Sequence, residues 1–278
     1  MKNFLLAAVL ITAVSCTNND GKNTTGKNGS KKQTTENTEA VNDSLVEKPD
    51  ADAATILAKK QVPILCYHHI KNGVNGEYSV TPEKFAEQMK LLADSGYKTV
   101  LPDDIYNYLM KGGSVPEKCV MISFDDTDLE QFTIGKTEMD KYGFKGVYFI
   151  MTIAMNRPRY MSKEQIKQLS DEGHVIACHT WDHHMVTKYT PEDWEIQLDK
   201  PKQKLEEIIG KNIRYFAYPF GLWNTTAIPE LQKRDIKMGF QLATKRDSTL
   251  PQYTVRRIIV AGQWSAGGML QAMKSSFK

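Results

Sequence analysis

Short apolar strands alternate with helical segments along the chain after about residue 60, and this alternation restricts the folds that the sequence can adopt. Strand–helix alternation builds right-handed βα units around a mostly parallel sheet. Seven or eight strands in this length of chain predict an α/β fold, a distorted (β/α) barrel. The predicted strands are Val62–Tyr67, Tyr97–Leu101, Cys119–Phe124, Gly146–Met151, His174–Cys178, Ile213–Ala217, Met238–Ala243 and Val255–Val260.

Several of the intervening helices have recognisable ends. Thr81-Pro82 predicts an N-cap followed by proline in the first helical position. Ser162 and Gln165 have the spacing of a capping box, in which each side chain bonds the other's backbone N–H. Thr190-Pro191 predicts the start of a longer helix, which ends at Gly210. These signals agree with the helices that the barrel requires between its strands.

Polar or turn-forming residues directly follow four of the predicted strands. His68 follows the first strand, Asp125 and Asp126 follow the third, His179 follows the fifth, and Tyr218–Gly221 follows the sixth. In (β/α) barrels the chemistry gathers at the carboxyl ends of the strands. The sequence therefore predicts a functional site at that end of the barrel.

Two of these clusters together predict a metal site. His179 and His183 are four residues apart, and Asp126 supplies a carboxylate from elsewhere in the chain. Two imidazoles and one carboxylate suit Zn²⁺, Co²⁺, Ni²⁺, Fe²⁺ or Mn²⁺ with open positions for water and substrate. Asp125 would then lie beside the metal, where a general base is needed. Taken singly, each motif has an ordinary structural explanation: two surface or core histidines, and a turn or a helix start.

The N-terminus predicts export and attachment to a membrane. Met1-Lys2 precedes an apolar run, Phe4–Val14, that is too short to cross a bilayer, and Ser15-Cys16 follows it. Residues 1–16 resemble a bacterial lipoprotein signal with Cys16 as the lipidated residue. The alternative is an ordinary secretory signal with an incidental cysteine. Residues 17–52 have almost no apolar content and predict a disordered tether, so the folded domain is expected at 53–278 in the cell envelope.

Charge and cysteine content exclude some classes of protein. The net charge of +3 is slight, and basic residues do not cluster with aromatic ones, so we expect no nucleic-acid partner. Cys66, Cys119 and Cys178 lie in or at the end of apolar runs. An odd number of cysteines cannot all pair, and these spacings match no zinc knuckle, so they predict core thiols. We expect a monomer.

The motifs resemble those of the NodB-homology polysaccharide deacetylases, carbohydrate esterase family 4. The resemblance rests on Ser-Phe-Asp-Asp, Gly-His-Val-Ile-Ala-Cys-His-Thr-Trp-Asp-His and Phe-Ala-Tyr-Pro-Phe-Gly, and it extends over 62–260. It implies that Asp125 is the catalytic base and that Asp126, His179 and His183 bind one divalent metal ion, Zn²⁺ in the first place.

Two positions depart from the family pattern. Ala217 stands where the family has an arginine that orients the base, which leaves that role without a residue. Thr127 stands where the family has glycine after the Asp pair, a position that permits positive φ. Thr127 predicts either a helix cap, with Asp128–Glu130 in the first turn, or a more crowded site.

Within this family the chain resembles the poly-N-acetylglucosamine deacetylases most. Val-Pro-Ile-Leu-Cys-Tyr-His-His and the motif without arginine are typical of that branch, in which an N-terminal histidine replaces a C-terminal catalytic one. No histidine follows His184 here, in agreement with that arrangement. The resemblance makes His68 the general acid, acting as an imidazolium. His69 and His174 are expected to be structural, and His184 a loop neighbour of His183.

The resemblance implies metal-dependent hydrolysis of N-acetyl groups on a polysaccharide such as poly-N-acetylglucosamine, or a peptidoglycan- or chitin-like glycan. The backbone N–H of Phe220 is expected to stabilise the oxyanion. Trp181, Tyr218, Phe220 and Trp223 could form a wall that faces the sugar, although core packing is an equal alternative for each. The alternatives for the whole protein are an O-acetyl esterase acting on a glycan such as acetylxylan, a catalytically weak glycan-binding metalloprotein, and a lipid-anchored scaffold.

Overall fold

The computed structural model describes residues 50–73, 76–242 and 245–277. The predicted signal peptide, the lipidation site Cys16 and the tether up to residue 49 lie outside these residues, so they remain predictions. Within the described part of the chain, no helix combines the length and the apolar character needed to cross a bilayer.

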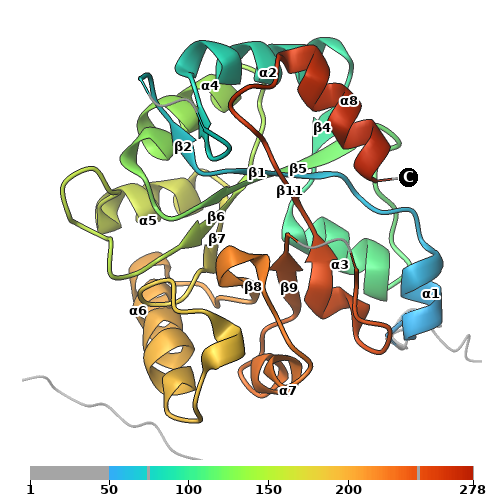
Figure 1. Cartoon of the computed structure of the whole chain (residues 1–278), viewed down its shortest axis with the longest axis vertical. Coiled ribbons are helices and arrows are strands. Elements are labelled where there is room, and N and C mark those ends of the chain that lie inside the picture. Colours follow the sequence, from blue (N-terminus) through green and yellow to red (C-terminus); the bar gives the residue numbers. More distant parts are fainter. Residues whose placement is uncertain (1–49, 74–75, 243–244, 278) are drawn as a thin grey trace, which may run out of the picture. The chain divides into compact units, whose positions relative to one another are not determined.

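The predicted parallel barrel is confirmed. All the neighbouring strands of the main sheet are parallel and follow the order β10-β9-β8-β7-β6-β5-β1-β11, and β4 pairs with the start of β5 (Figure 1). The sheet strands are β1 (Ile64–Tyr67), β4 (Lys98–Thr99), β5 (Cys119–Asp125), β6 (Val147–Ile150), β7 (Val175–Cys178), β8 (Tyr215–Ala217), β9 (Met238–Gln241), β10 (Val255–Arg256) and β11 (Ile258–Ile259). Two short strands, β2 (His69–Ile70) and β3 (Ser79–Val80), pair separately.

One short segment closes the barrel. The two ends of the strand order, β10 and β11, are neighbours in the sequence and are separated only by Arg257. Val255 and Arg256 pair with β9, whereas Ile258 and Ile259 pair with β1. The segment therefore joins the last strand to the first, and the predicted strand Val255–Val260 is present but divided at Arg257.

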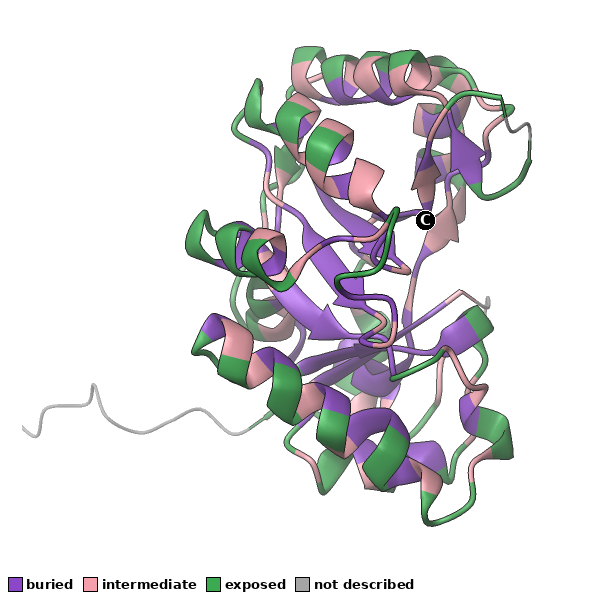
Figure 2. Ribbon diagram, turned by 90° about the vertical axis from the view of Figure 1, so that its left-hand side faces the viewer, coloured by how far each residue is buried: buried purple, intermediate pink, exposed green. Residues whose placement is uncertain are grey.

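Helices cover the outside of the barrel, and their outer faces are exposed whereas the strands are buried (Figure 2). Thr81 caps α2 by accepting a hydrogen bond from the N–H of Lys84, and Ser162 and Gln165 form the predicted capping box of α5. The helices are α1 (Ala53–Ala58), α2 (Pro82–Asp94), α3 (Pro102–Met110), α4 (Thr137–Asp140), α5 (Lys163–Asp171), α6 (Lys200–Ile209), α7 (Ala227–Gln232) and α8 (Ala266–Ser276); the helical turns are η1 (Gln131–Lys136), η2 (Val186–Lys188), η3 (Glu195–Asp199), η4 (Pro219–Gly221) and η5 (Pro251–Thr254).

The helix predicted to start at Thr190-Pro191 is present, but its helical run begins two residues later, at Asp193. Pro191 lies in a turn, and a π-helical segment, η3, precedes α6. Pro201 lies inside the continuous helical run and lacks the N–H that an α-helix needs, so the wider π turn accommodates it. The predicted end of the helix is confirmed, because Gly210 adopts the left-handed conformation of a C-cap.

Alternation along the strands determines which side chains point into the barrel. On β5, Ile122 and Phe124 pack with residues of the helices, whereas Met121 belongs to a second apolar cluster with residues of the other strands. Successive strand residues face opposite sides of a sheet, so Ser123 and Asp125 share the inward direction of Met121. The same alternation on β1 turns Cys66 inward.

The folded domain begins earlier than position 53. Asp52 caps α1 by accepting a hydrogen bond of 2.7 Å from the N–H of Thr55. The N–H of Ala51 donates to the carbonyl oxygen of Met110, and Asp50 forms an ion pair with Lys111. Residues 50–52 therefore belong to the domain, and the predicted tether 17–52 is too long by these three residues.

Candidate active site

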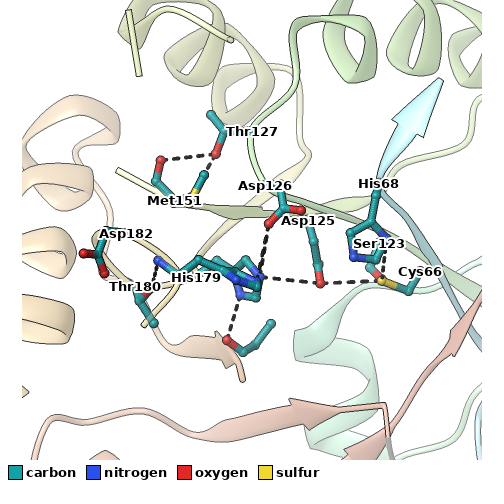
Figure 3. Close-up of polar contacts among 12 residues, drawn as sticks. Cys66, His68, Ser123, Asp125, Asp126, Thr127, Met151, His179, Thr180 and Asp182 are labelled. Atoms are coloured by element: carbon teal, nitrogen blue, oxygen red, sulfur yellow. Dashed lines mark hydrogen bonds and ion pairs between the residues drawn. The ribbon is translucent and has the colours of Figure 1, made fainter. Parts of the chain in front are cut away.

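The carboxyl ends of the strands bring the predicted site residues together. Asp125 is the last residue of β5 and Asp126 follows it, His179 follows β7, and His68 follows β1 (Figure 3). His183 lies on the loop after β7, with its ring centroid 4.8 Å from that of His179. Residues that are more than a hundred positions apart therefore surround one point at the mouth of the barrel.

Asp126, His179 and His183 form a set of metal-ligating groups. Oδ1 of Asp126 lies 3.5 Å from Nε2 of His179 and 3.7 Å from Nε2 of His183. The carbonyl oxygen of Ala217 accepts a hydrogen bond of 2.8 Å from Nδ1 of His179, which leaves Nε2 as the free lone pair. In a tetrahedral zinc site, nitrogen and oxygen ligands lie roughly 3.3 Å apart, so small side-chain movements would complete the geometry.

Two observations show that these residues fit a cation. Oδ1 of Asp126 and Nε2 of His179 are buried polar atoms without a hydrogen-bond partner, which is costly unless an ion or water satisfies them. Burial lowers the pKa of His179 to about 3, so its imidazole is neutral, as a ligand must be. Burial, together with the charge of Asp125, raises the pKa of Asp126 to about 7, and a bound cation would relieve both effects.

Arg257 holds Asp125 in place, and the sequence analysis did not identify it. The two terminal nitrogens of its guanidinium donate to Oδ1 and Oδ2 of Asp125 at 2.6 and 2.9 Å, and one of them also donates to Ser123. Both side chains are almost fully buried. The available signal was an arginine inside the predicted apolar strand 255–260, because a buried arginine needs a carboxylate or another acceptor. Arg257 thus makes the contact with Asp125 that the resemblance implied for the arginine replaced by Ala217.

The buried pair sets the protonation state of the carboxyl. Burial alone favours the neutral acid, but the guanidinium of Arg257 and the nearby His179 outweigh it and hold the pKa of Asp125 well below its usual range. Asp125 is therefore ionised throughout the neutral range, with its position fixed by a bidentate contact.

His68 lies beside Asp125 rather than in the metal-ligating set. It is 9% exposed, and its ring makes an edge contact with Tyr78 at 5.1 Å between centroids. Burial lowers the pKa of His68 to about 4, although the charge of Asp125 acts against this effect. In this structure His68 is thus a neutral imidazole near pH 7, in contrast to the predicted imidazolium.

The other histidines have the structural contacts expected of them. His69 pairs with Asp128. His174 is buried, and its Nδ1 accepts a hydrogen bond of 3.1 Å from the N–H of Gly146. His184 makes an edge contact with the ring of Tyr189, 5.4 Å between centroids.

The three cysteines within the described residues, Cys66, Cys119 and Cys178, are free and buried, as predicted. Cys66 is the one that adjoins the site: its thiol donates to Oδ2 of Asp125 at 3.5 Å.

A strained turn carries Phe220. Phe220 and Gly221 both have positive φ, 59° and 67°. A side chain at Gly221 would meet Cβ of Leu242 at 2.4 Å, so glycine is required here by space as well as by conformation. The turn places the ring of Phe220 against His183, 4.4 Å between centroids. The role of the Phe220 N–H in stabilising an oxyanion remains a prediction.

The structure divides the predicted aromatic wall. Trp181 and Phe220 are 40% and 56% exposed near the site, as a sugar-facing surface requires. Tyr218, in contrast, is fully buried in the core, because its position next to β8 turns it toward the helices, so its ring is not available to a glycan. Trp223 is half-buried, and its indole N–H donates to Gln241. Tyr78, which the sequence analysis did not select, is 48% exposed beside His68.

Thr127 neither caps a helix nor faces the site. It has φ of 73° and is fully buried, and its hydroxyl accepts a hydrogen bond of 2.8 Å from the N–H of Met151 (Figure 3). Positive φ is costly for a β-branched residue, and this hydrogen bond compensates part of the cost. Of the two predictions for Thr127, the cap is therefore wrong, and the side chain does not crowd the metal ligands.

Comparison with known proteins identifies the domain. The sequence pattern of the polysaccharide deacetylase family matches residues 112–239, which include the Asp pair and both metal-ligating histidines. The chain contains a polysaccharide deacetylase domain of the NodB-homology type. Asp125 and the set Asp126, His179 and His183 thus lie inside the matched part of the domain, and His68 and Arg257 lie outside it.

Relatives and solved structures extend the comparison. The chain is 28% identical to YxkH of Bacillus subtilis over 236 residues, which cover 82% of this chain and 83% of YxkH. It is 27% identical to a poly-beta-1,6-N-acetyl-D-glucosamine N-deacetylase of Staphylococcus aureus over 199 residues, 66% of this chain and 68% of the relative.

Two solved structures have the same fold. Streptococcus pyogenes deacetylase PplD has a TM-score of 0.72 at 23% identity, over 77% of this chain and 98% of that one. IcaB from Ammonifex degensii has a TM-score of 0.67 at 24% identity, over 79% and 98%.

Proposed function

We propose that this polysaccharide deacetylase is a metal-dependent enzyme that removes N-acetyl groups from poly-N-acetylglucosamine or a closely similar glycan. The observation that carries the proposal is the juxtaposition of an ionised, immobilised Asp125 with the unsatisfied ligand atoms of Asp126 and His179. A protein that only binds a glycan through a metal has no use for a second carboxylate fixed beside the ligands.

Asp126, His179 and His183 would hold the ion, with Zn²⁺ as the first choice and Co²⁺, Ni²⁺, Fe²⁺ or Mn²⁺ as alternatives. When bound, such an ion polarises the acetyl carbonyl and favours ionisation of the attacking water. Asp125 accepts the proton of that water, and the bidentate contact with Arg257 keeps its carboxylate directed at the reacting atoms.

His68 is the proposed donor of a proton to the departing amine. Because the pKa of His68 lies near 4, the imidazole is neutral at rest and must gain its proton before the amine leaves. The carboxylate of Asp125 is close enough to raise that pKa, so the two groups form one proton-transfer unit.

Exposed rings at the mouth support a sugar substrate. Trp181, Phe220 and Tyr78 offer apolar faces around the site, and such faces suit the C–H surfaces of pyranose rings. The named activity of the S. aureus relative supports N-acetylglucosamine as the sugar. The N-terminal sequence supports a further part of the proposal, an anchor through Cys16 in the cell envelope, and the enzyme is proposed to be a monomer.

Acetate release from acetylated glucosamine oligomers tests the proposal. The metal-free protein should be inactive, Zn²⁺ or Co²⁺ should restore release, and Asp125→Asn should remain inactive with its metal bound. His184→Ala is the matched control, because His184 adjoins the ligand loop without belonging to the set. Release from O-acetylated xylan but not from the N-acetylated oligomers would favour the esterase and contradict the proposal, as would metal-independent release.

A further inference from the structure

A second group of metal-ligating side chains lies directly beside the first. Within the described parts of the chain, Cys66, His68 and Asp125 place one ligand atom each within 4.8 Å of one another. Sγ of Cys66 lies 3.5 Å from Oδ2 of Asp125 and 4.0 Å from Nδ1 of His68. Figure 3 shows the three side chains converging between the ends of β1 and β5.

The geometry points to a second, inhibitory metal site. We propose that Cys66, His68 and Asp125 bind a thiophilic divalent ion, such as Zn²⁺, when it is in excess over the catalytic metal. In a tetrahedral zinc site a sulfur lies roughly 3.6 Å from its nitrogen and oxygen neighbours, so one separation already fits and the other needs only a small movement. Thiolate, imidazole and carboxylate together form a ligand set that zinc accepts readily.

The surroundings make this site the weaker of the two. Oδ2 of Asp125 lies 3.8 Å from Nε2 of His179, so an ion here would adjoin the catalytic one. Arg257 adds a further positive charge at the same carboxylate. Repulsion from both charges means that the second ion binds only after the first site is filled.

A third cluster, at the amino ends of β6 and β7, shows that a short distance between ligand atoms is not sufficient for a metal site. Asp140, Glu172 and His174 also place ligand atoms within 4.8 Å of one another. However, Nδ1 of His174 accepts a hydrogen bond from Gly146, which puts the proton on Nε2, and Lys136 already pairs with both carboxylates. In the proposed second site a cation pairs with one of the three groups: Arg257 donates to Asp125, and within the described residues no hydrogen bond joins it to Cys66 or His68.

Occupation of the second site would stop the reaction. The ion would engage Asp125, the proposed base, and His68, the proposed acid, so neither could transfer a proton. This consequence rests on the proposed function, whereas binding of the second ion does not. The two ideas can therefore fail separately.

Titration of the metal-free full chain with Co²⁺ tests the site, with Cys16→Ser in every protein so that this thiol does not contribute. The first equivalent should give no thiolate-to-cobalt absorption in the near ultraviolet, and the second should produce it. Cys66→Ala should lose this absorption and keep the first equivalent. Cys119→Ala is the matched control, a buried cysteine on the neighbouring strand β5, and should behave as the parent.

His68→Gln gives a second line of test, independent of whether Cys66→Ala folds. Loss of a group that only supports a ligand lowers metal affinity by roughly 10- to 100-fold, so loss of a ligand should lower the affinity for the second ion by more than this. The first ion should be retained.

Inhibition of acetate release gives a further measurement. A second equivalent of Zn²⁺ should lower the rate of the parent at least about tenfold. The rate of Cys66→Ala with two equivalents should stay close to its rate with one equivalent. Binding of a second equivalent of Co²⁺ without thiolate-to-cobalt absorption would overturn the inference, as would absorption that persists in Cys66→Ala. If the parent with one equivalent of metal released no acetate, but the absorption appeared with the second equivalent, the proposed function would be overturned and the second site would stand.

Discussion

At the scale of single residues, the fixed contact between Arg257 and Asp125 decides how the site can work. A guanidinium presents a rigid pair of donors that matches a carboxylate, whereas an ammonium acts as a mobile point charge. The pair is buried, so solvent does not compete for its hydrogen bonds, and Asp125, the proposed base, keeps both its charge and its direction.

Arg257→Lys should therefore lower kcat/KM by roughly 10- to 100-fold, the value of a charged hydrogen bond, with metal content unchanged. Arg257→Gln should in addition move the low-pH limb of the rate profile to higher pH, because loss of the positive charge raises the pKa of Asp125. Arg256→Lys is the control, since Arg256 bonds Gln61 and Ser276, away from the site. Equal losses at both arginines would show a general effect on folding instead.

His68 and His69 are sequence neighbours with different surroundings. His68→Ala should reduce activity by roughly 10²–10⁴-fold, the usual contribution of a positioned proton donor, with fold and metal content intact. His69→Ala should cost little activity, because His69 pairs with Asp128 at the side of the site. Acetate release and metal analysis of both variants decide the matter, and a larger loss at His69 would remove His68 from its role.

At the scale of elements, the turns after the strands hold the site in shape. The turn of η4 has positive φ at consecutive residues and brings Phe220 onto His183. The loop after β7 has positive φ at Thr180 and His183, and the hydroxyl of Thr180 accepts a hydrogen bond from the N–H of His183. Strain at these turns is located next to the proposed metal ligands, where the rest of the barrel can stabilise it.

Gly221→Ala should destabilise the domain by about 3 kcal/mol or more, because the new Cβ meets Leu242 as well as an unfavourable φ. Gly210→Ala is the matched control: Gly210 has φ of 68° and open space around it, so only about 1 kcal/mol is expected. Chemical unfolding of both variants gives the comparison. Similar losses would mean that the turn yields easily and does not position Phe220.

His174 connects the turn before β7 to the start of β6, and it makes stability depend on pH. Burial lowers the pKa of His174 from about 6.5 unfolded to about 4, so its contribution is complete above the unfolded pKa and is lost as pH falls toward the folded one. Between about pH 7.5 and about pH 5 the loss should be roughly 2 kcal/mol.

His174→Asn keeps an acceptor for the N–H of Gly146 but does not titrate, so its melting temperature should fall less than that of the parent across this range. Parent and variant should be compared without metal, because the other histidines then titrate in the same way in both proteins. A parallel decline in parent and variant would assign the acid sensitivity to another group.

At the scale of the whole molecule, the domain needs the few residues that precede α1. A chain that starts at Lys48 should have the melting temperature of the full chain, because the contacts of residues 50–52 are retained. A chain that starts at Ala53 loses the cap of α1 and should be less stable by roughly 1–2 kcal/mol. Asp52→Ala in the longer chain should reproduce about half of that loss. Equal melting temperatures for both truncations would place the boundary at residue 53 after all.

The sequence alone determined most of the elements and the site residues at their ends. Apolar runs, caps and the residues after each strand are local features, and parallel strands bring their carboxyl ends together whatever the details of packing. Asp125, Asp126, His179, His183 and His68 could therefore be placed at one mouth before any coordinates. The lipidation at Cys16 remains a prediction from such local features.

Only the tertiary structure decided which side chains meet across the barrel. Arg257 lies 132 positions from Asp125, and their contact depends on a strand that is interrupted at one residue while it closes the barrel. Cys66 reaches Asp125, and Tyr218 turns into the core, through the register and pleat of strands that are distant in the sequence. Local patterns carry no information on that register, because it is fixed by the packing of all the strands at once.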